Sequence, residues 1–267
     1  MDDFTPDSFL VCDLHPSPNH GERRGCDGPD AIVLHYTGLR TGDAEASWRA
    51  DPGGEALRWL IDPVSQVSSH YLVHEDGRIV QLVREARRAW HAGRSSWAGE
   101  TDINSFSIGI EIANPGHDGG LPPFADKQIE AVIALCRDIS ARHRLVPQRV
   151  LAHSDIAPGR KIDPGARFPW DELHKQGVGH WVKPEAISGG RFFARGDSGQ
   201  PIEALRAMLA MYGYGISVEP EFDEATENVV AAFQRHFRPA RIDGVADSST
   251  ILTLRNLIAA LDAPTIA

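Results

Sequence analysis

The pattern of the sequence changes at residues 176–190, where Gly, Pro and Ser replace the hydrophobic periodicity found on either side. Short β-type segments and one long amphipathic segment come before this stretch, and three amphipathic segments joined by short turns follow it. The first pattern predicts an α/β (α+β) domain with a mixed central β-sheet flanked by helices. The second predicts a small helical bundle. We therefore expect one domain at 1–182 with an irregular arm at 1–30, a linker at 183–190 and a three-helix domain at 191–267.

Several elements of the first part can be placed from local patterns. A short apolar strand at 31–34 ends at His35, and residues 70–83 form a hairpin around an Asp-Gly turn. Residues 107–113 alternate, with isoleucines on one face and Glu111 on the other. Apolar residues recur at helical spacing over 126–143, and another short strand covers 149–153. Two histidines, His35 and His153, thus lie at strand ends.

Composition excludes several classes of function. The 267 residues contain 37 acidic and 27 basic side chains, which gives a net charge of −10. Such a chain lacks the basic surface typical of nucleic-acid binding and of binding to anionic membranes. No apolar run is long enough to span a bilayer, and three cysteines without a C-x-x-C spacing predict no disulfide framework. The first residues do not show the basic region followed by an apolar region that is typical of a signal peptide, so we expect a cytoplasmic protein.

The most informative polar residues are His35, His153 and Asp163, which follows His153 by ten residues. Two imidazoles and a carboxylate provide three ligands for zinc and leave a fourth position open, as in catalytic zinc sites. A single histidine at a strand end is more often a structural residue. From spacing alone both interpretations stay open, because the chain has no H-E-x-x-H motif.

Two further side chains fit a hydrolytic centre. Glu111 is either a solvated carboxylate on a half-exposed sheet or a general base that takes a proton from the attacking water. Lys161 is either an exposed loop lysine or an ammonium group that stabilises an oxyanion. Neither choice can be made from these two residues by themselves.

Five ordered blocks of the sequence decide between these interpretations. They are Leu34-His-Tyr-Thr-Gly38, Ser69-His-Tyr-Leu-Val73, Ala89-Trp-His-Ala-Gly93, Asn104-Ser-Phe-Ser-Ile-Gly-Ile-Glu-Ile-Ala-Asn114 and His153-Ser-Asp-Ile-Ala-Pro-Gly-Arg-Lys-Ile-Asp-Pro-Gly165. Over about residues 28–175 the chain resembles the zinc N-acetylmuramoyl-L-alanine amidases of the AmpD/AmiD kind. The resemblance implies one zinc ion held by His35, His153 and Asp163, with Glu111 as base and Lys161 as oxyanion partner. It also implies hydrolysis of the amide between N-acetylmuramic acid and L-alanine, in peptidoglycan or in muropeptides.

Residues near the expected cleft are candidates for substrate binding. Arginines at 84, 87, 88 and 94 surround Trp90 and His91, and form either a solvated basic turn or a patch that attracts the carboxylates of a stem peptide. We assign five residues to substrate binding: Trp90, His91, Arg94, Asn104 and Arg160.

The last part of the chain resembles peptidoglycan-binding helical domains over roughly 190–262. The blocks that carry this resemblance include Gly196-Asp-Ser-Gly199, Ala204-Leu-Arg-Ala-Met-Leu209 and Ile242-Asp-Gly-Val245. A wall-binding domain attached to a wall amidase would raise the effective substrate concentration by tethering. The alternative is a bundle that only supports the amidase domain.

The sequence therefore predicts a zinc-dependent amidase whose partner is peptidoglycan or a muropeptide, and for which a monomer is favoured. Two alternatives remain: a metallopeptidase that cuts within the stem peptide, and a muropeptide receptor without activity. A wall-binding tail makes the periplasm the alternative to the cytoplasm.

Overall fold

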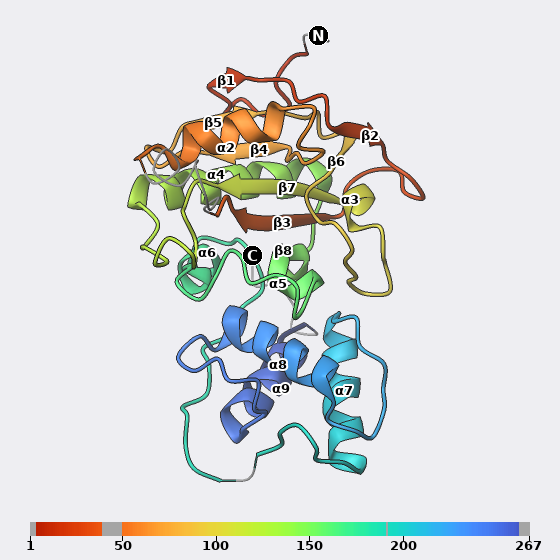
Figure 1. Ribbon diagram of the computed structural model, residues 1–267. Coiled ribbons are helices and arrows are strands. Elements are labelled where there is room, and N and C mark those ends of the chain that lie inside the picture. The colour runs from red at the N-terminus through yellow and green to blue at the C-terminus, as the bar shows by residue number, and fades with distance from the viewer. Residues whose placement is uncertain (1–3, 39–49, 191, 262–267) are drawn as a thin grey trace.

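The computed structural model describes residues 4–38, 50–190 and 192–261. A sheet with its helices forms the first part of the molecule, and three helices form the second (Figure 1). No helix among the described residues has the length and apolarity needed to cross a membrane. The predicted α/β class, a mixed sheet flanked by helices followed by a helical bundle, is confirmed.

The central sheet has six strands in the order β1-β5-β4-β7-β3-β8. All neighbours in it are parallel except β4 and β5, which form the predicted hairpin. Its strands are β1 (Asp13–Leu14), β3 (Ala31–Tyr36), β4 (Tyr71–Val73), β5 (Ile79–Gln81), β7 (Ser107–Ile112) and β8 (Val150–Ala152). A separate antiparallel pair joins β2 (His20–Glu22) to β6 (Arg87–Ala89).

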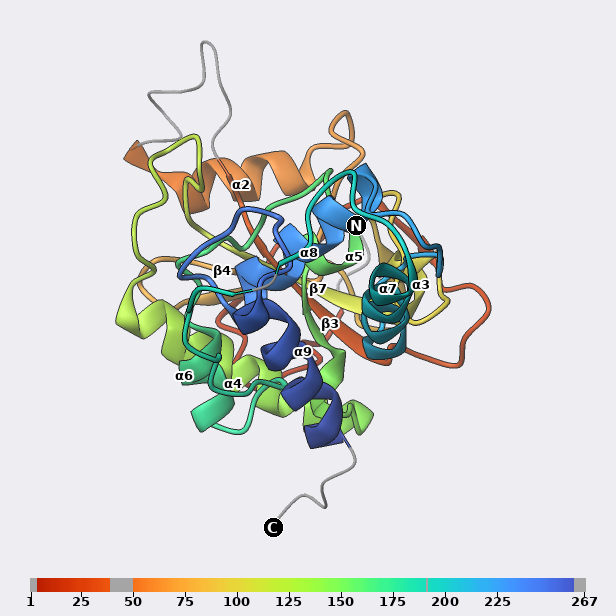
Figure 2. The same cartoon turned by 90° about the horizontal axis from the view of Figure 1, so that it is seen from below.

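Helices α2 (Pro52–Ile61) and α4 (Asp126–His143) cover opposite faces of this sheet (Figure 2). Helix α4 has the predicted bounds, and its apolar stripe, which includes Val132 and Ile139, packs on the isoleucine face of β7. The shorter elements of this part are α3 (Ile103–Phe106), a 3₁₀ turn (Pro147–Arg149), α5 (His153–Ile156) and α6 (Trp170–Lys175).

Two predictions about the first part need correction. The arm at 1–30 is not irregular throughout, because β1 extends the sheet beside β5 and β2 pairs with β6. The strand predicted at 149–153 ends at Ala152, and His153 begins helix α5. Both differences arise from pairing and packing partners that lie far away in the sequence.

The parallel strands bring the candidate residues to one end of the sheet. Strand β3 lies between β7 and β8, and His35 is in register with Glu111 of β7. Since β8 ends at Ala152, His153 lies at the same carboxyl edge. Ligand sites of open α/β sheets form at this edge.

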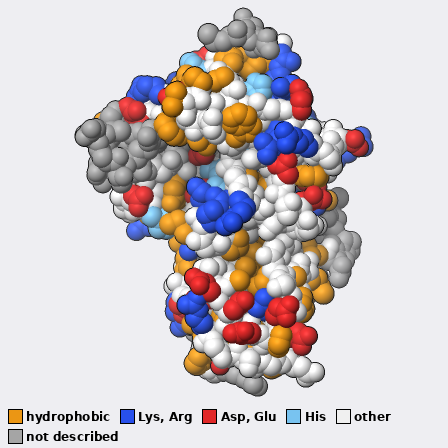
Figure 3. Space-filling view, turned by 45° about the vertical axis from the view of Figure 1, so that its right-hand side comes forward, with side chains coloured by type: hydrophobic (Ala, Val, Ile, Leu, Met, Phe, Trp, Pro, Cys, Tyr) orange, Lys and Arg blue, Asp and Glu red, His pale blue; other side chains and the backbone are white. Residues whose placement is uncertain are grey.

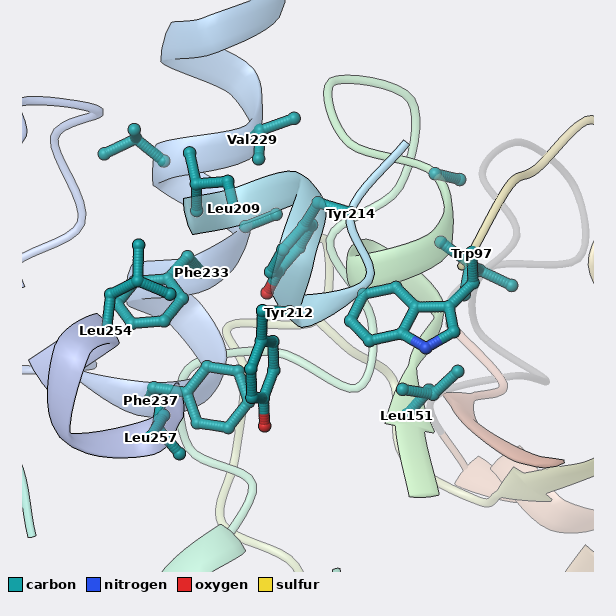
Figure 4. Packing of buried hydrophobic residues seen from close by; sticks show 14 of the residues in the cluster. Trp97, Leu151, Leu209, Tyr212, Tyr214, Val229, Phe233, Phe237, Leu254 and Leu257 are labelled. Carbon is teal, nitrogen blue, oxygen red and sulfur yellow. The ribbon is translucent and has the colours of Figure 1, made fainter. Parts of the chain in front are cut away.

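The C-terminal part consists of α7 (Gln200–Tyr212), α8 (Glu224–Phe237) and α9 (Ser248–Leu261). Residues 183–190 contain no helix or strand. The two parts share one hydrophobic cluster, in which Trp97 and Leu151 of the first part pack with Tyr212, Tyr214 and other apolar side chains of the second (Figure 4). The C-terminal helices are therefore packed on the first part rather than joined to it by the linker alone.

Candidate metal centre and active site

Three buried side chains converge at the carboxyl edge of the sheet. His35 Nδ1 and His153 Nδ1 lie 2.9 Å apart, and Asp163 Oδ2 lies 3.1 Å from the first and 2.9 Å from the second. His35 comes from β3, His153 from the start of α5 and Asp163 from the loop after α5. The structure thus brings together the three residues that were predicted to bind metal.

The hydrogen bonds of the other ring nitrogens show which nitrogens carry the protons. His153 Nε2 lies 3.1 Å from the carbonyl oxygen of Ala92, so Nε2 donates, and in the neutral ring Nδ1 presents a lone pair. His35 Nε2 lies 3.0 Å from His91 Nδ1, and His91 Nε2 lies 3.2 Å from the hydroxyl of Ser107, which itself donates to the Ile103 carbonyl. His35 Nε2 is therefore the donor, and its Nδ1 is a lone pair as well.

Two lone pairs and a carboxylate oxygen within about 3 Å repel one another unless a cation lies among them. Burial and the neighbouring His153 lower the pKa of His35 to about 4, so its ring stays neutral near pH 7. The pKa of Asp163 lies below its usual range because both histidines oppose the cost of burial. This donor set, two imidazole nitrogens and a carboxylate oxygen, is one that binds a divalent metal such as zinc.

Glu111 lies beside this group on β7. One of its oxygens, Oε2, is buried and has no hydrogen-bond partner among the described residues. Burial and the nearby Asp163 raise the pKa of Glu111 well above its usual range, and Lys161 opposes this shift. A carboxylate without a partner, next to three electron-rich atoms, is suited to exchanging a proton with a bound molecule.

A cavity of about 460 Å³ opens over these residues. In the space-filling view, histidine side chains lie within a hollow that has Lys and Arg side chains beside it (Figure 3). The cavity is lined by the three candidate ligands, Glu111, Lys161 and eleven further residues, namely Tyr36, Thr37, Gly38, Ala56, Trp59, Leu60, Val67, His91, Asp118, Arg160 and Ile162.

The residues assigned to substrate binding are not all placed alike. Arg160 lines the cavity and donates to the Ala92 and Arg94 carbonyls at 2.7 Å each. His91 also lines the cavity, but its ring is buried: Nδ1 contacts His35 and Nε2 contacts Ser107. Asn104 is buried, and its side-chain oxygen accepts the backbone N–H groups of His91 and Ala92. Trp90 and Arg94 are not among the cavity-lining residues.

Two of the four arginines in the candidate basic patch are paired with acidic side chains. Arg87 forms an ion pair with Glu22, and Arg88 pairs with Asp102 at 2.6 Å. These acidic partners come from β2 and from the residue before α3, so the pairing could not be seen in the local sequence. Among the described residues, the positive side chains that line the cavity are instead Lys161 and Arg160.

The position of the His91 ring depends on Gly109, which was not among the predicted site residues. A Cβ atom at Gly109 would lie 2.4 Å from His91 Cγ, so a side chain at this position of β7 would displace the ring. Glycine therefore lets His91 lie flat enough against the sheet to reach His35 Nε2. The alternation of Gly109 and Glu111 on the polar face of the strand was the available signal.

Comparison with protein families agrees with this geometry. Residues 25–166 match the family described as N-acetylmuramoyl-L-alanine amidase, and residues 198–254 match a peptidoglycan binding domain. The N-acetylmuramoyl-L-alanine amidase AmiD of Escherichia coli is 41% identical over 235 residues, which cover 82% of this chain and 78% of that protein. The 1,6-anhydro-N-acetylmuramyl-L-alanine amidase AmpD of Enterobacter cloacae is 35% identical over 62% of this chain and 90% of its own length.

Solved structures show the same similarity. The complex of E. coli AmiD with anhydro-N-acetylmuramic acid-L-Ala-D-γ-Glu-L-Lys superposes with a TM-score of 0.69 at 38% identity, covering 89% of this chain and 93% of that one. AmpDh3 of Pseudomonas aeruginosa in complex with anhydromuramic pentapeptide gives a TM-score of 0.69 at 28% identity, covering 98% of this chain and all of that one. Both comparisons include the C-terminal part.

Proposed function

The chain belongs to the N-acetylmuramoyl-L-alanine amidase family and hydrolyses the amide between N-acetylmuramic acid and L-alanine, and we propose that it does so with zinc held by His35, His153 and Asp163. The observation that carries this proposal is the convergence of two imidazole lone pairs and a carboxylate oxygen beside the unpartnered carboxylate of Glu111. When bound, zinc supplies a Lewis acid that activates water as a nucleophile and polarises a carbonyl group.

Glu111 is the proposed general base. Its unpartnered Oε2 takes a proton from the attacking water and gives it to the amine nitrogen of L-alanine as that group leaves. Burial raises the pKa of Glu111, and a carboxyl group with a raised pKa holds the proton better on its way to the amine.

Lys161 is the proposed oxyanion partner. It lines the cavity and lies two residues before Asp163, on the same loop as this candidate ligand. Its ammonium group can therefore stabilise the negative charge that develops on the amide oxygen when water attacks the carbonyl carbon.

For the substrate we propose a muropeptide that carries an anhydro-N-acetylmuramic acid end, as in the complexes of the two similar structures. Arg160 is the proposed contact for a stem-peptide carboxylate, because its guanidinium lines the cavity. Trp90, His91, Arg94 and Asn104 stay predictions as substrate contacts. So do the monomeric state and the cytoplasmic location, with the periplasm as its alternative.

The C-terminal domain is proposed to bind peptidoglycan, in line with the family match over 198–254. A pull-down of the chain with insoluble sacculi, using the Glu111→Gln variant so that the polymer is not digested, measures this directly. Binding by the inactive variant that free muropeptide does not displace would support a separate wall site.

The reaction is tested by digesting intact sacculi and soluble anhydro-muropeptides side by side and weighing the products. An amidase releases an intact peptide that begins with L-alanine, whereas a peptidase would release shorter fragments. Glu111→Gln should release almost no peptide, and treatment with a chelator should stop the reaction until zinc is restored. Activity that survives complete removal of metal would overturn the metal assignment and leave the amidase assignment intact.

A further inference from the structure

Helix α5, which begins with the candidate ligand His153, has a buried carboxylate two residues later that is held by the C-terminal domain. Asp155 Oδ1 accepts a hydrogen bond of 2.8 Å from the hydroxyl of Tyr214, and Oδ2 lies 2.6 Å from His236 Nδ1. Within its own segment, Oδ2 also accepts the backbone N–H of Ala152 at 2.8 Å. Asp155, Tyr214 and His236 are at most 3% exposed.

The loop that carries the other site residues is built on the same helix. The backbone N–H of Ala157 donates to the His153 carbonyl, and that of Lys161 donates to the Ala157 carbonyl. The N–H of Ser154 donates to the carbonyl of Asp163 at 3.0 Å. A movement of α5 therefore moves two candidate ligands and the proposed oxyanion partner together.

The two donors from the C-terminal domain are themselves firmly placed. The His236 ring stacks on Trp170 with centroids 3.7 Å apart, and the Tyr214 ring packs edge-on against Trp97 at 5.0 Å. The neighbouring backbone is also tied down, because the Ala98 N–H donates to the Gly213 carbonyl at 2.7 Å. Because packing holds Tyr214 and His236 in place, their hydrogen bonds hold the Asp155 carboxylate in place as well.

We infer that Tyr214 and His236 are positioning residues for the metal centre: through Asp155 they fix α5, and with it His153 and the loop to Asp163. The inference rests on the proposed metal site. It assigns to the C-terminal domain a role inside the amidase reaction, beyond any attachment to the cell wall. Outer partners of metal ligands hold the ligand in the orientation that the metal needs, and their loss typically weakens metal binding by about 10–100-fold.

A pair of tyrosines in this interface provides a matched test in the full-length protein. Tyr214→Phe removes the hydroxyl that donates to Asp155, whereas Tyr212→Phe removes a hydroxyl that bonds His180 at 2.8 Å and has no hydrogen bond to α5 among the described residues. Both tyrosines are buried in the same cluster, and each variant loses one hydrogen bond of 2.8 Å, which is buried for Tyr214 and partly buried for Tyr212. Zinc affinity is measured by competition with a chromophoric chelator, and thermal unfolding of the metal-free protein is recorded beside it.

We expect Tyr214→Phe to weaken zinc binding about tenfold and Tyr212→Phe to leave it unchanged, although both lower the unfolding temperature. His236→Leu should also weaken zinc binding, and His236→Asn, which keeps an N–H near the position of Nδ1, should restore part of the affinity. The visible spectrum of the cobalt-loaded protein should change in Tyr214→Phe and not in Tyr212→Phe.

Equal zinc affinities in the two tyrosine variants, whether both reduced or both normal, would overturn the inference and leave Tyr214 a residue of the domain interface only. The proposed function fails in a different way, since in that case the wild-type protein would bind no zinc or would release no peptide beginning with L-alanine.

Discussion

Two of the buried histidine–aspartate contacts in the described part of the molecule have opposite chemistry. His153 Nδ1 lies 2.9 Å from Asp163 Oδ2 at the candidate metal centre, and His236 Nδ1 lies 2.6 Å from Asp155 Oδ2 between the domains. One residue, Ser154, separates His153 from Asp155, and all four side chains are buried. Residue type, distance and burial therefore do not tell a metal site from a structural contact.

The difference lies in what completes each contact. The proton of His153 is used by the Ala92 carbonyl, so its Nδ1 faces Asp163 without a hydrogen and His35 adds a second bare nitrogen. Asp155, in contrast, receives hydrogens from an amide, a phenol and an imidazole. Because the two histidine nitrogens and the Asp163 oxygen lack hydrogens between them, the first contact is the candidate metal site. Because Asp155 accepts three hydrogen bonds, the second contact is structural.

The strongest test of this comparison is to remove the histidine of each contact in turn. We expect His153→Ala to abolish amidase activity and to weaken zinc binding by more than about 1,000-fold, since loss of a ligand exceeds the 10–100-fold cost of losing a ligand's partner. His236→Leu leaves Asp155 short of a donor and should cost about 3 kcal/mol of unfolding free energy. Metal titration and urea unfolding of both metal-free variants measure the two effects.

The comparison requires each variant to affect mainly one measurement: His153→Ala the zinc affinity, and His236→Leu the free energy of unfolding. His153→Ala should be nearly as stable as the wild type without metal, because it removes one of the repelling lone pairs. If it were instead as unstable as His236→Leu, the centre at Asp163 would be a structural contact like the other.

Glu111 provides the next largest effect. We expect Glu111→Gln to lower kcat by about 1,000-fold. Zinc binding and the free energy of unfolding should stay near the wild-type values, because Glu111 forms no hydrogen bond with His35, His153 or His236 among the described residues. Steady-state kinetics and metal content of the purified variant check this. A variant that kept more than a tenth of the activity would place the general base elsewhere.

Much of the fold could be predicted because its signals are local. The apolar stripe of α4 lies within 18 residues, so the periodicity gave the observed bounds Asp126–His143. The Asp76-Gly77 turn likewise marks the β4–β5 hairpin. The three candidate ligands could be named because they lie within sequence blocks that resemble a known family.

Features that depend on distant partners could not be predicted. Strands β1 and β2 have two and three residues and form because β5 and β6 offer free edges, not because of any pattern of their own. Helix α5 is buried because α8 packs on it, and Asp155 acquires its partners 59 and 81 residues further along the chain. The positions of His91 and Asn104 likewise follow from contacts across the sheet edge.

Glu85 is another buried carboxylate, and unlike Asp163 and Asp155 it forms an ion pair with an arginine, Arg142, in the described part of the chain. Its oxygens accept hydrogen bonds from Tyr71 at 2.6 Å and Arg142 at 2.7 Å, and His143 lies 2.7 Å away. These partners lower the pKa of Glu85 to about 2. Relative to an unfolded value near 4.5, this corresponds to about 3 kcal/mol of stability.

Because the folded pKa is depressed, this stability is present above about pH 4.5 and is lost as the pH falls towards 2. We expect Glu85→Gln to be about 3 kcal/mol less stable than the wild type at pH 6, with the gap closing between pH 4.5 and 2. Urea unfolding across this range measures it. The same substitution at the exposed Glu130 of α4 should produce no such gap, and a pH-independent gap at Glu85 would mean that packing, not charge, is responsible.

His91 yields the smallest expected effect and decides between its two possible roles. Its ring accepts the proton of His35 Nε2, so His91→Ala should weaken zinc binding by about 10–100-fold, equivalent to about 1.4–2.7 kcal/mol. His70 is the matched control: it is buried beside His91 with ring centroids 5.8 Å apart, but it bonds the backbone of Gly109 and Arg87 rather than a ligand. His70→Ala should lose stability and keep zinc affinity. Should His91→Ala instead raise KM at unchanged zinc affinity, the ring would contact substrate, and the orientation of His35 would depend on β3 alone.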